Sequence, residues 1–107
     1  MPKYVQSNPE PPQRVSQVIE IFGMTPLRAE ILRYLSTHPE GSTSGDIGRA
    51  LSANYRTVAR HLVTLEEFGV VDSDATKDRQ GFRVLYCINP EKLSVAAQLL
   101  FKYLHGQ

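Results

Sequence analysis

The segment Leu51-Ser-Ala-Asn-Tyr-Arg-Thr-Val-Ala-Arg-His-Leu-Val-Thr-Leu-Glu-Glu-Phe-Gly-Val-Val71 decides the fold of this chain. Its apolar residues Val58, Leu62 and Leu65 recur at i, i+4 and i+7, which places them on one face of a helix. Arg56 and Arg60 lie one turn apart on the opposite face. A helix that is apolar behind and cationic in front, and that follows a turn, suits the major groove of DNA.

The signals around this helix predict its bounds and a helix before it. Asn54 is a good N-cap, and Gly69 stands where a left-handed residue ends a helix, so the helix should run from Tyr55 to about Phe68. The turn before it is Ser52-Ala53. A shorter helix capped by Thr43 or Ser44 should come first, after a loop at residues 40–43, with a core of Ile47, Ala50 and Leu51.

Two glycines weaken the local signal for that shorter helix. Gly45 and Gly48 each cost about 1 kcal/mol relative to alanine in an exposed helix interior. Small residues at these positions would alternatively let another helix approach closely. The sequence leaves both interpretations open.

The chain after the long helix predicts a β-hairpin. Val70-Val71 begins one strand, residues 72–81 form a polar tip, and Phe82 to Ile88 form the returning strand. Cys87, the single cysteine, lies in this second strand and excludes an internal disulfide. A free cysteine in a strand is typical of a small packed hydrophobe, with a reactive thiol as the alternative.

Three further helices are predicted outside this region. Thr25-Pro26 and Asn89-Pro90 each combine an N-cap side chain with proline at the first helical position. The first of these helices should end near Thr37, and an earlier helix should run from Arg14 to a stop at Gly23. The predicted fold class is therefore mainly α with a small antiparallel hairpin: one winged helix-turn-helix domain, residues 14–107, after a flexible proline-rich arm, residues 1–13.

Composition excludes several classes of function. No apolar run approaches the roughly 20 residues that span a bilayer, and no signal peptide is evident, which predicts a cytoplasmic protein without a membrane partner. No P-loop, nucleophile elbow or dinucleotide turn is present, so we expect no enzyme activity and no cofactor. The net charge of +1 is low for a nucleic-acid binder, and a homodimer would compensate by placing two basic patches side by side.

Helical position predicts which side chains would contact DNA. Arg56 and Arg60 are expected to contact base edges, since arginine bonds guanine bidentately. Asn54, Tyr55, Thr57 and Ala59 flank them, while Lys77, Arg79 and Arg83 are candidate phosphate or minor-groove contacts in the wing. Interleaved aspartates oppose the wing contacts, and a solvated cationic face is the alternative throughout. His61, on the flank of the apolar face, is predicted to pack or to face a phosphate.

The chain resembles the ArsR/SmtB-like family of transcriptional repressors over residues 15–104. The residues that carry the resemblance are Thr57-Val-Ala-Arg-His-Leu62, Leu65, Gly69-Val-Val71, Tyr86-Cys-Ile-Asn-Pro90 and Thr25-Pro-Leu-Arg-Ala-Glu-Ile-Leu-Arg-Tyr-Leu35. Similar sequence motifs also occur in MarR-like and other winged-helix families. The resemblance implies a homodimer built from the first and last helices, with the apolar residues Val15, Val18, Ile19, Phe22, Leu93, Ala97, Leu100 and Leu104 at its interface.

The chain departs from that family in metal sensing. The helix before the turn lacks the family's cysteines, and the three histidines have no ligand spacing, so no metal site is predicted. The leading hypothesis is a homodimeric, sequence-specific regulator, acting as a repressor on double-stranded DNA at a pseudo-palindromic operator. No effector class is predicted. The alternative is a winged-helix adaptor that binds another protein through its apolar terminal helix.

Overall fold

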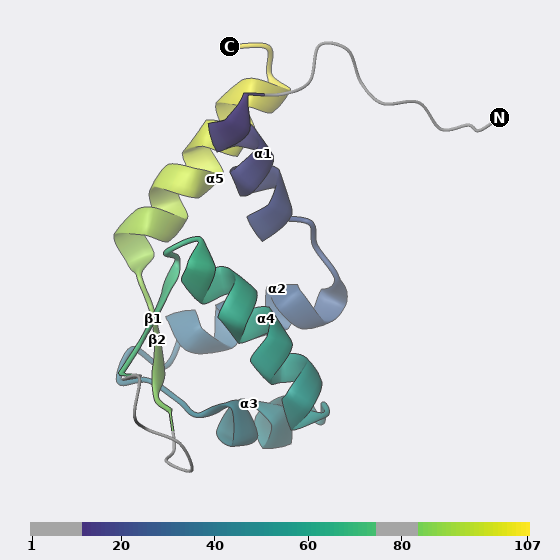
Figure 1. Ribbon diagram of the computed structural model, residues 1–107, viewed down its shortest axis with the longest axis vertical. Helices are drawn as coiled ribbons and strands as arrows, with labels where there is room; N and C mark the ends of the chain where they lie inside the picture. Colours follow the sequence, from purple (N-terminus) through teal and green to yellow (C-terminus); the bar gives the residue numbers. More distant parts are fainter. Residues whose placement is uncertain (1–11, 75–83) are drawn as a thin grey trace, which may run out of the picture.

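The computed structural model describes residues 12–74 and 84–107, and it has the predicted architecture (Figure 1). Five helices and one two-stranded antiparallel hairpin follow one another in the order α1, α2, α3, α4, β1, β2, α5. The helices are α1 (Gln13–Ile21), α2 (Pro26–Ser36), α3 (Ser44–Leu51), α4 (Tyr55–Glu67) and α5 (Pro90–Leu104). This arrangement confirms the winged helix-turn-helix prediction.

Local sequence signals set the helix starts as predicted. The side chains of Thr25, Asn54 and Asn89 each accept a hydrogen bond from a backbone N–H in the first turn of α2, α4 and α5. Thr43, rather than Ser44, caps α3 in the same way. Four of the five helices therefore begin at a side-chain cap.

The helix ends agree with the sequence within a residue or two. Gly69 follows α4 with a φ of 84°, in the left-handed region that favours glycine. Thr37 and Phe68 are the C-caps of α2 and α4. The first helix begins at Gln13, one residue earlier than predicted, and its C-cap is Phe22.

The hairpin is shorter than its sequence pattern suggested. Strand β1 (Val71–Ser73) pairs with β2 (Tyr86–Ile88) in the register Val71 to Ile88, Asp72 to Cys87 and Ser73 to Tyr86. The predicted strand 82–88 is thus limited to its last three residues within the described part of the chain. The predicted arm, residues 1–13, lies outside the described residues except for its last two.

One correction concerns the loop predicted at residues 40–43. Ser42 forms an antiparallel β-bridge with Tyr86: its N–H donates to the Tyr86 carbonyl at 2.9 Å, and the Tyr86 N–H donates back at 2.8 Å. Strand β2 is therefore bonded on both edges, by β1 and by Ser42. A single bridging residue has no alternating pattern, so nothing in the local sequence indicates it.

The core joins all five helices and both strands of the described residues. Val58, Leu62 and Leu65, the predicted apolar face of α4, are completely buried. They belong to one cluster with residues of every other helix and of both strands, including Val18, Ile31, Leu35, Ile47, Val71, Tyr86 and Ala96. Ala50, predicted as a core residue of α3, is exposed, whereas Ile47 and Gly48 are buried.

Candidate nucleic-acid interface

The turn between α3 and α4 is tight, and Gly48 makes it so. A Cβ atom at Gly48 would lie 2.9 Å from the Ala53 carbonyl oxygen and 3.3 Å from Tyr55 Cα. The Ala53 N–H donates to the Gly48 carbonyl at 2.8 Å. Ser52, in the turn, adopts a φ of 55°, which is costly for a residue with a Cβ. The close approach of α4 to α3 is therefore set by backbone contact at Gly48.

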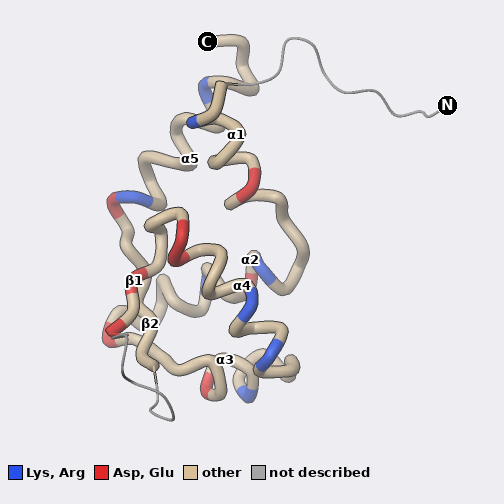
Figure 2. Tube along the Cα trace, in the orientation of Figure 1, with Lys and Arg blue, Asp and Glu red and all other residues tan. Residues whose placement is uncertain are grey.

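The outer face of α4 carries the predicted base-contacting arginines. Arg56 and Arg60 are both exposed and lie opposite the buried face. Figure 2 shows the basic positions on the half of α4 nearer α3 and acidic positions toward its other end. In a helix-turn-helix, the N-terminal residues of the second helix are the ones that contact base edges in the major groove.

Neighbours on the same helix hold both arginine side chains. The guanidinium carbon of Arg56 lies 5.8 Å from the centroid of the Tyr55 ring, and its Nε donates to the Tyr55 hydroxyl at 3.4 Å. This hydroxyl contact raises the pKa of Arg56 further above its usual range. Arg60 donates from Nη2 to the Thr57 hydroxyl at 3.3 Å. Both guanidinium groups keep other donors available for DNA.

The structure describes six of the nine predicted DNA-contact residues, those at the start of α4. Asn54 uses its side chain to cap α4, accepting from the Arg56 N–H at 2.8 Å. Tyr55 is exposed, while Thr57 and Ala59 are half-buried on opposite flanks of the helix. The wing positions Lys77, Arg79 and Arg83 lie outside the described residues.

Sequence reasoning missed Arg28, at the start of α2. Its Nε donates to Nδ1 of His61 on α4 at 3.0 Å, and its Nη1 donates to the Glu20 carbonyl at 2.8 Å. Arg28 thereby joins the end of α1 to the flank of α4. Partial burial, together with the charges of Arg28 and Arg60, lowers the pKa of His61 below its ordinary value. The hydrogen bond from Arg28 likewise requires Nδ1 of His61 to be an unprotonated acceptor.

The predicted dimerisation helices, α1 and α5, lie side by side at the end of the molecule away from α3 (Figure 1). Val15 and Val18 are buried inside the single chain, while Phe22, Leu93 and Leu100 are half-buried. Ile19, Ala97 and Leu104 are exposed, so these three form the accessible part of the predicted interface. Val95 and Phe101, which the prediction omitted, are also largely exposed.

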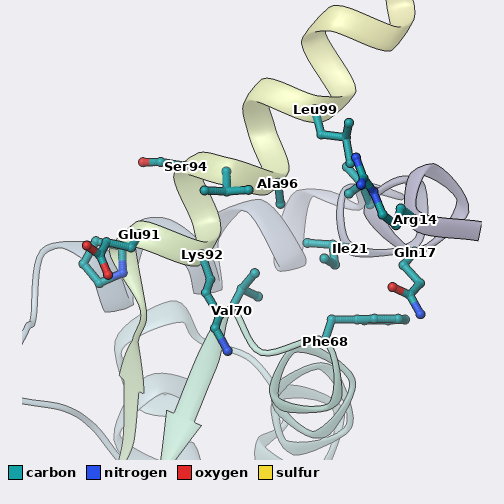
Figure 3. Close-up of a pocket in the computed structure, with 13 residues that line it drawn as sticks. Arg14, Gln17, Ile21, Phe68, Val70, Glu91, Lys92, Ser94, Ala96 and Leu99 are labelled. Carbon is teal, nitrogen blue, oxygen red and sulfur yellow. The ribbon is translucent and has the colours of Figure 1, made fainter.

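A groove of about 790 Å³ opens between α1, α5 and the end of α4 (Figure 3). Phe68 and Val70 form its floor, and Ile21, Ala96 and Leu99 add apolar wall. Arg14 and Lys92 come from α1 and α5 respectively. The groove therefore adjoins both helices that are predicted to dimerise.

Other chemistry is sparse in the described residues. No group of three or more His, Cys, Asp or Glu side chains there could hold a metal ion, and no helix there is long and apolar enough to cross a membrane. Cys87 is half-buried beside Gly41: a Cβ on that glycine would lie 2.8 Å from the cysteine sulfur.

Comparison with known proteins agrees with this architecture. Residues 29–75 match the family model of the IclR helix-turn-helix domain. A search of curated proteins found no match. The match covers most of α2 together with α3, the turn, α4 and β1. This family model of DNA-binding domains therefore includes the same helix-turn-helix that carries the candidate interface.

Solved structures show the same fold. A possible transcriptional regulator from Methanosarcina mazei is 14% identical, with a TM-score of 0.67 over 85% of this chain and 78% of that one. A mutant of MepR from S. aureus, bound to an oligodeoxyribonucleotide, is 25% identical, with a TM-score of 0.56 over 88% and 70%. A homodimeric winged helix-turn-helix domain from Mycobacterium bovis, a possible ArsR-family regulator, is 22% identical, with a TM-score of 0.60 over 84% and 78%.

These findings define the class of domain. The chain carries a winged helix-turn-helix, the kind of domain with which transcriptional regulators bind DNA. The broad resemblance to winged-helix regulators is confirmed. The matching family model is of the IclR type, so it does not confirm the narrower ArsR/SmtB resemblance.

Proposed function

We propose that this protein is a sequence-specific, DNA-binding transcriptional regulator that acts as a homodimer and represses by occupying a pseudo-palindromic operator. The observation that carries the proposal is the outer face of α4, where Arg56 and Arg60 are exposed on a helix fixed against α3. The oligonucleotide bound to the MepR mutant supports the same use of the fold. An ArsR/SmtB-like assignment is part of this proposal, supported by the possible ArsR-family regulator from M. bovis.

In this proposal, sequence specificity for DNA depends on few side chains, chiefly the two arginines of α4. Each bidentate contact to guanine contributes about 1–3 kcal/mol of discrimination between bases. The near-neutral net charge of +1 provides little general attraction to DNA, so binding should depend on these residues more than on overall charge. A dimer would present both helices to successive major grooves, about 34 Å apart.

The experiment that tests this function is selection of a binding site from random duplexes, followed by affinity measurements. Arg56→Ala and Arg60→Ala should each weaken binding to the selected site by about tenfold or more, and weaken binding to random DNA much less. Arg33→Ala, which removes an exposed arginine near the end of α2, is the matched control. Wild-type affinity for the selected site in both α4 variants would refute the assignment of α4.

Homodimerisation is the second part of the proposal. Phe101 and Leu104 expose 62% and 70% of their surface near the end of α5, and Ile19 is exposed on the neighbouring α1. Large apolar side chains gathered on adjacent helices favour a covering partner, and the homodimeric domain from M. bovis supports a second copy.

Light scattering during size-exclusion chromatography tests the dimer directly. The measured mass of the wild-type protein should be twice that of one chain. Phe101→Lys combined with Leu104→Lys should lower the measured mass toward that of the monomer. A monomeric wild type that does not bind DNA at low salt would instead favour the protein-adaptor hypothesis.

A further inference from the structure

A second, smaller cavity lies on one flank of α4, against the start of α2. It has a volume of about 180 Å³ and is lined by Arg28, Thr57, Arg60, His61 and Thr64. Every lining side chain has a hydrogen-bond donor, and none of them is acidic. Two guanidinium groups beside two hydroxyls and an imidazole form a site for an anion.

The hydrogen bonds of Arg28 hold its guanidinium group in place and leave one of its nitrogens available to a ligand. Nε and Nη1 of Arg28 are held by His61 and by the carbonyl of Glu20 at the end of α1. Within residues 12–74 and 84–107, Nη2 of Arg28 donates no hydrogen bond to the protein. Because Nδ1 of His61 is the acceptor, the proton of its neutral ring is on Nε2, which adds a further donor.

The flank of α4 that carries the cavity is the one that faces away from the hairpin. Thr57, His61 and Thr64 follow one another at i, i+4 and i+7 along it. On the other flank, Glu66 accepts a hydrogen bond from the Ser73 hydroxyl of β1 at 2.6 Å. A helix in the major groove has a phosphate backbone on each side, so with α4 in the groove the cavity would face one backbone and the hairpin the other.

We propose that this cavity binds a backbone phosphate of double-stranded DNA, with Arg28 as the principal ligand and Thr57 and His61 beside it. The proposal rests on the proposed function and adds a contact from α2, outside the helix-turn-helix itself. A phosphate held by α2 and α4 together would fix how deeply α4 enters the groove. It would also connect that position to α1, through the bond between Arg28 and the Glu20 carbonyl.

The test begins with the duplex selected for the wild-type protein. Arg28→Gln should weaken binding to this duplex and to random duplexes alike, by about tenfold, since a phosphate contact carries no sequence information. The slope of log affinity against log salt should fall in magnitude by about 0.9 for each phosphate that the variant no longer neutralises. Arg33→Gln, an equal change of charge on the same helix, should change affinity by less than about twofold.

Neutral phosphates provide the decisive comparison. Single methylphosphonate substitutions along the selected duplex should identify one phosphate whose neutralisation weakens the wild-type protein but has no further effect on Arg28→Gln. Thr57→Val removes a hydroxyl donor from the cavity and leaves every hydrogen bond of Arg28 intact. Neutralising the same phosphate should therefore cost this variant less affinity than it costs the wild type. This result does not depend on whether Arg28→Gln loosens the fold.

Two failures can be told apart in this experiment. If the wild-type protein binds no duplex, the proposed function itself is wrong. The second failure concerns the cavity alone. If the wild type binds DNA, but neutralising each phosphate lowers the affinity of the wild type, Arg28→Gln and Thr57→Val by the same factor, the cavity is not a phosphate site. Binding of free inorganic phosphate at millimolar concentration, with no phosphate of the duplex affected, would likewise overturn the assignment to DNA.

Discussion

Replacing Gly48 with alanine tests whether close contact between α3 and α4 fixes the binding helix. Alanine is normally the better helix residue, by about 1 kcal/mol in an exposed interior. At Gly48, however, the new Cβ would lie 2.9 Å from the Ala53 carbonyl oxygen and 3.3 Å from Tyr55 Cα. Both are backbone atoms, which cannot rotate away as a flexible side chain would. The turn must therefore move.

The expected magnitude follows from these opposing effects. Forcing a methyl group into a filled site typically costs about 1–3 kcal/mol, so the free energy of unfolding should fall by about 0–2 kcal/mol after the helix-propensity gain of about 1 kcal/mol is subtracted. Gly45→Ala is the matched control in the same helix. Its Cβ would lie no closer than 3.7 Å to another group, so it should be neutral or stabilising by up to about 1 kcal/mol.

Urea unfolding followed by circular dichroism measures both variants against wild type. Gly48→Ala should also lose DNA affinity under conditions where it remains folded, because the displaced turn changes the angle of α4. If Gly48→Ala is as stable as Gly45→Ala, the backbone contact does not limit the approach of the helices. If it is less stable but binds DNA normally, the contact matters for folding and not for positioning α4.

Three further changes should have separable effects. Asn54→Ala removes the cap of α4 and should lower the free energy of unfolding by about 1 kcal/mol in urea titrations; no change would argue against the cap. Ser52→Gly relieves a left-handed residue and should raise thermal stability slightly, whereas a loss would mean that the serine side chain itself stabilises the turn. His61 has a lowered pKa, so the unfolded chain binds its proton first and stability should fall as pH drops below about 6.5, the ordinary histidine value. His61→Asn, which keeps an acceptor near Arg28 but does not titrate, should flatten that part of the pH profile in thermal unfolding, and an unchanged profile would assign it to other groups.

Local interactions explain what the sequence could predict. The caps Thr25, Asn54 and Asn89 bond to backbone within their own first turn, and the left-handed Gly69 follows directly after its helix. Such signals need only a few neighbouring residues. The buried face of α4 follows equally from the spacing of its apolar side chains.

Contacts between distant residues explain what the sequence missed. Arg28 and His61 are 33 positions apart, and nothing in either local pattern links them. The bridge from Ser42 to Tyr86 joins a predicted loop to the hairpin, and only the packed fold brings the two together. Val15 and Val18, predicted at a dimer interface, are already buried within the single chain, in which α1 contacts α5. Helical spacing identifies an apolar face and not the partner that covers it.

The bridge between Ser42 and Tyr86 also limits how this protein can be divided. Residues 29–75, the part that matches a helix-turn-helix family, contain Ser42 and β1 but not β2. A fragment cut at those bounds would expose two unpaired backbone edges and leave the core without Tyr86 and Ala96. The segment that carries the family likeness shares its core with the chain before and after it, so we expect a fragment with these bounds to be unstable.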